Sequence, residues 1–150
     1  MAKNKVERWT NSHLPEVSRM RIYVAGPYSA ETADLRQENT NKAMDAGIQI
    51  FKKGHFPLVP HLTHYIELRA IETGVSMTWE EYLAWDKPWL EHCQGFLLLA
   101  PSKGALIELA HARSLGLRIF SSLAEIPEAG PHEGNPFRAG ARPSAQPLTA

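Results

Sequence analysis

Residues 96–120 constrain the fold more than any other part of the chain. They read FLLLAPSKGALIELAHARSLGLRIF: an apolar run, a turn, an apolar helical pattern, a glycine and a second apolar run. This order predicts a buried strand at 96–100, a helix at 104–115 with Gly116 as its C-cap, and a strand at 117–120. Two buried strands joined through a helix pair in parallel, so the segment predicts a parallel sheet covered by helices.

The rest of the chain continues the alternation of strands and helices. Apolar runs predict further strands at 20–25 and 56–59, and helical patterns predict helices at 32–54, 79–92 and 121–126, with a short helix and a loop within 61–76. Thr78 and Glu81 match a capping box at the start of the helix 79–92. The predicted fold is a small Rossmann-like (flavodoxin-like) α/β domain, a doubly wound parallel sheet of four to five strands in three layers, α/β/α.

Two of these helices have candidate buried faces. In the helix 32–54 the candidates are Leu35, Ala43, Ala46, Ile50 and Phe51; in the helix 79–92 they are Trp85, Trp89 and Leu90. With Trp79, Tyr82, Trp85 and Trp89, the helix 79–92 carries more apolar surface than one sheet face needs. We therefore expect it to form a subunit interface in a homodimer or higher homo-oligomer.

Length and composition limit the classes of protein that the chain can belong to. Its 150 residues suit one domain, which we place at 20–126 between a flexible leader (1–19) and a disordered tail rich in Pro, Gly and Ala (127–150). With 16 basic and 16 acidic residues, it lacks the positive charge of a duplex-binding protein. No apolar stretch suits a signal peptide or a membrane span, so we expect a cytoplasmic protein without a membrane partner. The single cysteine, Cys93, is expected to be buried and inert.

Three loops should meet where the parallel strands end, which is where such sheets bind ligands. The first loop holds Gly26, Pro27, Tyr28 and Ser29; it is either a simple turn or a site where a ligand approaches the backbone and stacks on the tyrosine. The second holds His61 and His64, whose spacing of three suggests a metal site, but no third ligand is evident. A hydrogen bond from His61 to a substrate is the preferred interpretation.

The third loop holds Ser102 and Gly104 and leads to Glu108. Ser102 can cap the helix, and the exposed amides of the first turn favour an anion. Glu108 stands among apolar residues, either as a working carboxylate or as a surface residue, and His111, three positions on, can pair with it. Asp86 lies beside Trp85 and Trp89; it is either an exposed partner of Lys87 or a desolvated carboxylate with a raised pKa, suited to a general acid.

Together, these segments resemble the nucleoside 2-deoxyribosyltransferases and their relatives, the 2′-deoxynucleoside 5′-phosphate N-hydrolases. The resemblance covers about residues 20–122 and rests on four elements in order: IYVAGPYS at 22–29, Pro60-His61, Trp85-Asp86, and Ser102-x-Gly104-Ala105-x-x-Glu108. It implies that Glu108 is a nucleophile, that Asp86 binds the sugar and assists departure of the base, and that Ser102 contacts a 5′-phosphate. It also implies that Gly26–Ser29 lies beneath the sugar and base.

One position departs from the pattern of the relatives, which commonly have an aspartate before the third strand where this chain has Gln94. If that aspartate helps to protonate the base, the activity here would be altered or narrowed. The resemblance implies an N-glycosidase that acts on a nucleoside or nucleotide without a metal or other cofactor. Two alternatives remain at this point: a nucleoside 2-deoxyribosyltransferase that exchanges bases, and a non-catalytic module that binds or senses nucleotides.

Overall fold

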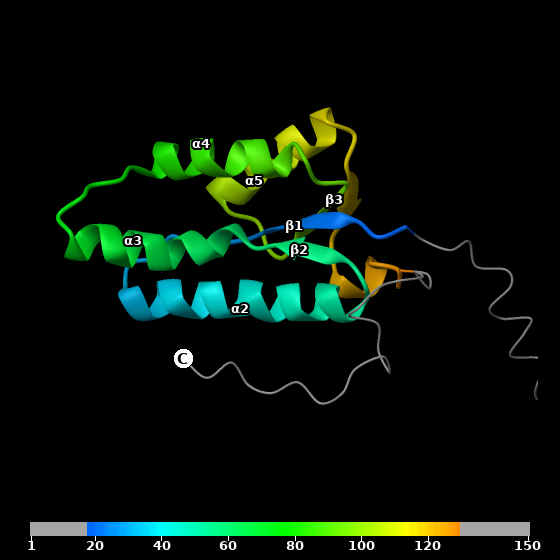
Figure 1. The fold of residues 1–150 in the computed structure, drawn as a ribbon, viewed down its shortest axis with the longest axis horizontal. Helices are drawn as coiled ribbons and strands as arrows, with labels where there is room; N and C mark the ends of the chain where they lie inside the picture. The colour runs from blue at the N-terminus through cyan, green and yellow to red at the C-terminus, as the bar shows by residue number, and fades with distance from the viewer. Residues whose placement is uncertain (1–17, 130–150) are drawn as a thin grey trace, which may run out of the picture.

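A computed structural model describes residues 18–129 as a four-stranded, all-parallel sheet with helices on its faces (Figure 1). The strands are β1 (Arg21–Ala25), β2 (Phe56–Leu58), β3 (Gly95–Leu98) and β4 (Arg118–Phe120), in the order β2-β1-β3-β4. The helices are α2 (Ala33–Lys52), α3 (Thr63–Glu72), α4 (Trp79–Leu90) and α5 (Lys103–Ser114), with short 3₁₀ turns η1 (Pro60–Leu62) and η2 (Leu123–Glu125). The predicted α/β fold, with four strands, is confirmed.

Successive residues of β1 enter two separate cores, because side chains along a strand alternate between the faces of the sheet. Ile22 and Val24 lie in a core with α2 and η2, whereas Tyr23 and Ala25 lie in a core with α4 and α5. All four side chains are at most 1% exposed. Figure 1 shows the same layering, with α2 on one side of the strands and α4 and α5 on the other.

The helix ends follow the local signals in the sequence. Thr78 accepts a hydrogen bond from the amide of Glu81, whose side chain bonds back to the amide of Thr78, which is the predicted capping box. Gly54 and Gly116 have φ angles of 93° and 74°, a backbone conformation that favours glycine just after a helix. Element boundaries differ from the predicted ones by one or two residues.

Two of the predicted buried faces need correction. In α2, the buried positions are Thr40, Ala43, Ala46, Gly47 and Ile50, which follow the helical period. Leu35 and Phe51 lie off this line and are 47% and 43% exposed.

In α4, Trp85 and Trp89 are 44% and 59% exposed, and only Leu90 is buried. The inward stripe of this helix runs instead through Trp79, Tyr82, Leu83 and Asp86, at helical spacings of three and four, and these four side chains border a pocket. The inner face of α4 therefore covers a cavity, and the two tryptophans lie on another face.

Most of the predicted leader and tail, residues 1–17 and 130–150, lies outside the described residues. Hydrogen bonds join the described end of the chain to the domain; one runs from Lys53 Nζ to the carbonyl oxygen of Ile126 at 3.0 Å. The ring of buried His55 lies 2.6 Å from the carbonyl oxygen of Pro127, and the amide of Ala129 donates to the carbonyl of Lys53 at 2.9 Å. Within residues 18–129, no helix combines the length and apolarity needed to cross a bilayer.

Candidate active site

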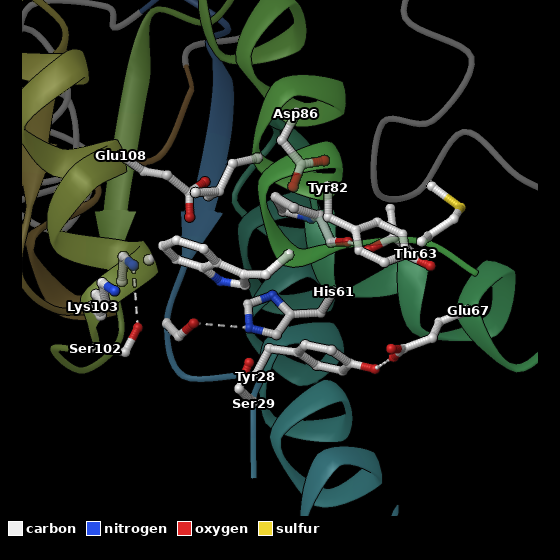
Figure 2. Close-up of a pocket in the computed structure, with 17 residues that line it drawn as sticks. Tyr28, Ser29, His61, Thr63, Glu67, Tyr82, Asp86, Ser102, Lys103 and Glu108 are labelled. Atoms are coloured by element: carbon white, nitrogen blue, oxygen red, sulfur yellow. Dashed lines mark hydrogen bonds between the residues drawn. The ribbon is translucent and has the colours of Figure 1, made fainter.

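A pocket of about 500 Å³ lies at the carboxyl ends of the strands, where a parallel sheet places its ligand (Figure 2). Its walls come from the β1–α2 loop, η1 and α3, α4, and the start of α5. Eight of the nine predicted site residues border it: Gly26, Tyr28, Ser29, His61, Asp86, Ser102, Gly104 and Glu108. Pro27 does not border the pocket, although its carbonyl oxygen lies 3.1 Å from the ring of His61.

Glu108 is placed by α5, which packs one face on the sheet and turns the glutamate toward β1. Ala105, Leu109 and Ala112 fill the core beneath the helix, and the hydroxyl of Tyr23 donates a hydrogen bond to Glu108 Oε2. Burial raises the pKa of Glu108 to about 7, although the hydrogen bond from Tyr23 acts in the opposite direction. Glu108 is therefore a desolvated carboxyl group whose ionised form is supported by one specific donor.

Tyr23 is a site residue that the sequence analysis missed. It is fully buried, and its ring stacks on that of Phe96 with centroids 5.8 Å apart. Burial, and then the negative charge of Glu108, raise the pKa of Tyr23 well above its usual value, so the hydroxyl keeps its proton. The signal was available: a tyrosine inside an otherwise apolar buried strand needs a partner for its hydroxyl.

Asp86 faces the same pocket from α4. Burial is the main cause that raises its pKa to about 7, and the negative charge of Glu108 adds to it. Asp86 is partly buried, and the ion pairs of the described residues include none between Asp86 and Lys87, so the alternative that it is an exposed partner of Lys87 is wrong. The pocket holds two carboxyl groups in different surroundings: Glu108 receives a hydrogen bond that favours ionisation, and Asp86 experiences only influences that favour protonation.

The β1–α2 loop approaches the pocket through Gly26, where a Cβ atom would lie 3.1 Å from the Cβ of Leu99. Glycine thus lets this loop pack against the end of β3. Residues of α3 fix the Tyr28 side chain, because its hydroxyl donates to Glu67 at 2.5 Å and lies 2.8 Å from His64 Nδ1. Its ring meets those of His61 and His64 edge-on, so Tyr28 is part of a fixed wall.

The two histidines of the second loop have different surroundings. His61 borders the pocket, whereas buried His64 lies between Tyr28 and Gln37, with its Nε2 3.1 Å from Gln37 Oε1. Within the described part of the chain, no three His, Cys, Asp or Glu side chains are grouped closely enough to hold a metal ion.

The start of α5 forms a corner of the pocket suited to an anion. The hydroxyl of Ser102 accepts a hydrogen bond from the amide of Ala105 at 3.1 Å, which is the predicted cap. The amides of Lys103 and Gly104, in the first turn, have no partner within the helix. The Lys103 ammonium group lies 5.0 Å from the centre of the Trp79 ring and borders the same corner. Free amides and a cation together favour a negatively charged group.

Two further expectations are corrected by the geometry. Gln94 precedes β3 at the amino end of the sheet, where its side-chain oxygen accepts a hydrogen bond from the amide of Arg21 at 2.7 Å. It does not border the pocket, so its position gives no reason to expect altered chemistry there. His111 pairs with Glu91 at 3.2 Å instead of with Glu108.

The other residues that border the pocket were not among the predicted site residues: Pro60, Thr63, Glu67, Met77, Trp79, Tyr82, Leu83, Lys103 and Ala105. Most of them come from α3 and α4. The spacing of the pocket-facing residues in α4, one every three or four positions, was the signal that could have identified that wall.

Comparison with known proteins identifies a family. No curated protein matches the chain. A domain family described as a domain of unknown function, DUF4406, matches residues 20–121. The matched region runs from β1 to β4 and includes every element that borders the pocket. The chain belongs to the DUF4406 family.

Proposed function

We propose that this protein is an N-glycosidase that cleaves the bond between base and sugar in a nucleoside or deoxynucleoside 5′-monophosphate. The observation that carries the proposal is the pair of carboxyl groups, Glu108 and Asp86, which face one pocket and differ in their hydrogen bonding. Such a pair suits a reaction that needs both a nucleophile and an acid.

In the proposed first step, a Glu108 carboxylate oxygen bonds to the anomeric carbon while the bond from that carbon to the base nitrogen breaks. The electrons of the broken bond pass to the base, and the carboxylic proton of Asp86 neutralises it. Positive charge develops on the sugar as the bond stretches, as in other glycoside hydrolysis, and the Glu108 carboxylate stabilises that charge. The products of this step are the free base and a glycosyl ester on Glu108.

In the second step, water attacks the anomeric carbon and Asp86, now ionised, accepts a proton from it. The ester bond breaks, its electrons return to Glu108, and the sugar phosphate leaves. The enzyme regains one ionised and one protonated carboxyl group. If a second base takes the place of water, the same intermediate gives base exchange.

The protonation states that this mechanism requires agree with the surroundings of the two groups. Tyr23 donates to Glu108 and so favours its ionised form, whereas burial and the charge of Glu108 favour protonated Asp86. Since each pKa is raised to about 7, the pair holds close to one proton at neutral pH.

We propose that the 5′-phosphate binds at the start of α5. Ser102, the free amides of the first turn and the Lys103 ammonium group form the part of the pocket suited to an anion. The resemblance of the Ser102–Glu108 segment to the nucleotide N-hydrolases supports the same placement. A phosphorylated substrate is therefore favoured over a free nucleoside.

We also propose that the protein acts as a homo-oligomer. Trp85 and Trp89, exposed on the outer side of α4, form an apolar surface that a second copy can cover. A monomer observed by analytical ultracentrifugation at micromolar concentrations would contradict this part of the proposal.

A panel of nucleosides and nucleotides, incubated with and without a second free base, tests the proposed activity. Release of free base and sugar phosphate indicates hydrolysis, and incorporation of the added base indicates the alternative, a deoxyribosyltransferase. Tight binding without either reaction would indicate a nucleotide-binding module. If no ligand of the panel binds or reacts, all three assignments fail.

A further inference from the structure

The wall of the pocket formed by η1 and α3 displays hydrogen-bond acceptors. Thr63 shows the pattern, because its hydroxyl proton is already donated to the carbonyl oxygen of Pro60 at 2.8 Å. The oxygen of Thr63, which borders the pocket, is left to accept.

His61 presents an acceptor for a similar reason. Its Nε2 lies 3.2 Å and 3.1 Å from the carbonyl oxygens of Gly26 and Pro27. Carbonyl oxygens only accept, so Nε2 carries the proton of the neutral ring and Nδ1 carries the lone pair. The residue is 6% exposed, and Nδ1 has no partner among residues 18–129. Burial lowers the pKa of His61, which keeps Nδ1 unprotonated at neutral pH.

Glu67 adds a carboxylate to this wall. Its Oε2 accepts a hydrogen bond from the hydroxyl of Tyr28 at 2.5 Å, and its second oxygen remains for a ligand. Across the pocket, the buried hydroxyl of Tyr82 has no partner within the described range 18–129. A buried polar atom without a partner is costly, and a ligand that supplies the missing hydrogen bond removes the cost.

The position of this wall decides which part of the substrate it meets. Figure 2 shows Ser102 and Lys103 at one end of the pocket and Thr63 and Glu67 at the other, with His61 between them. With the phosphate at the Ser102 end and the anomeric carbon beside Glu108, the base extends toward Thr63 and Glu67.

We infer that the η1–α3 wall selects bases that carry an exocyclic amino group, such as cytosine and adenine, over their carbonyl counterparts. This inference rests on the proposed function, which supplies the nucleotide and its orientation. An amino group offers two hydrogens to acceptors from Glu67, Thr63 and His61, while the Tyr82 hydroxyl can donate to a ring acceptor. A carbonyl oxygen at the same place has lone pairs and no hydrogen to donate, so it repels these acceptors and leaves them unpaired. A site built from such acceptors therefore rejects the carbonyl-bearing base strongly.

Two pairs of probes isolate this feature: deoxycytidine against deoxyuridine monophosphate, and adenosine against inosine monophosphate. Each pair exchanges an amino group for a carbonyl. Calorimetry with the Glu108→Gln variant measures binding without turnover, and wild-type base release gives the matching ratio of kcat/KM. We expect the amino-bearing member of at least one pair to be favoured about tenfold or more in both measurements.

The Glu67→Gln variant tests the origin of the preference. The amide oxygen of the new glutamine can still accept from Tyr28, while its NH₂ group can donate to a carbonyl. The ratio of amino-bearing to carbonyl-bearing probe, in affinity and in kcat/KM, should therefore fall toward one. Glu72→Gln, on the exposed side of α3, is the matched control and should keep the wild-type ratio. Thr63→Ala removes a different acceptor and should also reduce the ratio. It replaces Glu67→Gln as the test if circular dichroism shows that Glu67→Gln does not fold.

The outcomes separate this inference from the proposed function. Base release at equal rates from both members of each pair overturns the inference and leaves the N-glycosidase assignment intact. Preferential binding of the amino-bearing probes without base release supports the inference and overturns the N-glycosidase assignment. If no probe binds, both the inference and the assignment are overturned. If the ratio is unchanged in both Glu67→Gln and Thr63→Ala, the preference does not come from the η1–α3 wall and the inference is overturned.

Discussion

The hydroxyl of Tyr23 donates a hydrogen bond to the carboxylate of Glu108, which joins residues that are 85 positions apart in the chain. The bond links β1 to α5 through the buried layer between them. It is the specific contact that distinguishes Glu108 from Asp86, since it favours the ionised form of a carboxyl group that burial otherwise drives toward protonation.

Replacement of Tyr23 by Phe should therefore impair the reaction in a pH-dependent manner. Loss of the hydrogen bond raises the pKa of Glu108 further, so the acidic limb of the kcat/KM profile should move to higher pH. At neutral pH we expect a decrease in kcat/KM of about tenfold or more. Tyr65→Phe, at an exposed tyrosine on α3, is the control; equal profiles for both variants and wild type would contradict the role of Tyr23.

The wild-type pH profile itself should be bell-shaped. The mechanism needs one ionised and one protonated carboxyl group, and burial raises the pKa of both Glu108 and Asp86 to about 7. We expect kcat/KM for base release to be greatest near that pH and to fall on both sides. A rate that keeps rising up to pH 9 would show that no protonated carboxyl group takes part.

Asp86→Asn should stabilise the protein above neutral pH while it reduces activity. The pKa of Asp86 rises from its ordinary 3.8 to about 7 on folding, so the native state binds the proton more tightly than the unfolded state. The contribution of Asp86 to the free energy of unfolding is fully present below its pKa in the unfolded chain. It is lost as the pH rises through its pKa in the folded protein. Asparagine cannot ionise, so the variant avoids this loss.

Urea denaturation at pH 8 should show an increase in the free energy of unfolding of about 1–2 kcal/mol for Asp86→Asn, after allowance for partial exposure to solvent. The gain should shrink as the pH falls and disappear toward pH 3, below the ordinary pKa of 3.8, where wild-type Asp86 is protonated in both states. Asp45→Asn, at an exposed position of α2, should show no such gain. A variant equally or less stable than wild type at pH 8 would contradict the desolvation of Asp86.

Substitutions of Ser102 can separate its two roles, as a helix cap and as a phosphate contact. Aspartate caps helices as well as serine does, but its charge repels a phosphate. Ser102→Asp should therefore keep the thermal stability and raise KM for nucleotides by about tenfold or more. Ser102→Ala should lose about 1 kcal/mol of stability. If Ser102→Asp leaves KM for nucleotides unchanged, the phosphate does not bind at the start of α5.

The layered fold could be predicted from the sequence because its signals are local. Apolar runs of strand length, helical periods and caps such as Thr78 and Ser102 each depend on a few neighbouring residues, and each lies where the sequence analysis placed it. The prediction that Trp85 and Trp89 are buried was wrong, because apolar character alone does not determine which face of α4 packs toward the interior. The inner face of α4 covers a pocket, a feature created only by the packing of distant segments.

The candidate site was predictable where a residue stood out from its neighbours. Glu108 stands among apolar residues, Asp86 lies beside Trp85 and Trp89, and both carboxyl groups face the pocket. Tyr23 and Glu67 were missed because their significance depends on partners 85 and 39 positions away, Glu108 and Tyr28. Conversely, Gln94 drew attention by comparison with the family that the sequence resembles, but it lies at the amino end of the sheet, opposite the pocket.

The most direct test of the account compares base release from nucleoside 5′-monophosphates by wild-type protein and by Glu108→Gln, with binding measured in parallel. Glutamine preserves the size of the side chain and removes the nucleophile. We expect wild-type protein to release free base, and Glu108→Gln to lose at least about a thousandfold in kcat while its affinity stays within a few fold. Undiminished turnover in Glu108→Gln, or no base release by the wild type from any nucleotide, would contradict the assignment of Glu108 as the nucleophile of an N-glycosidase.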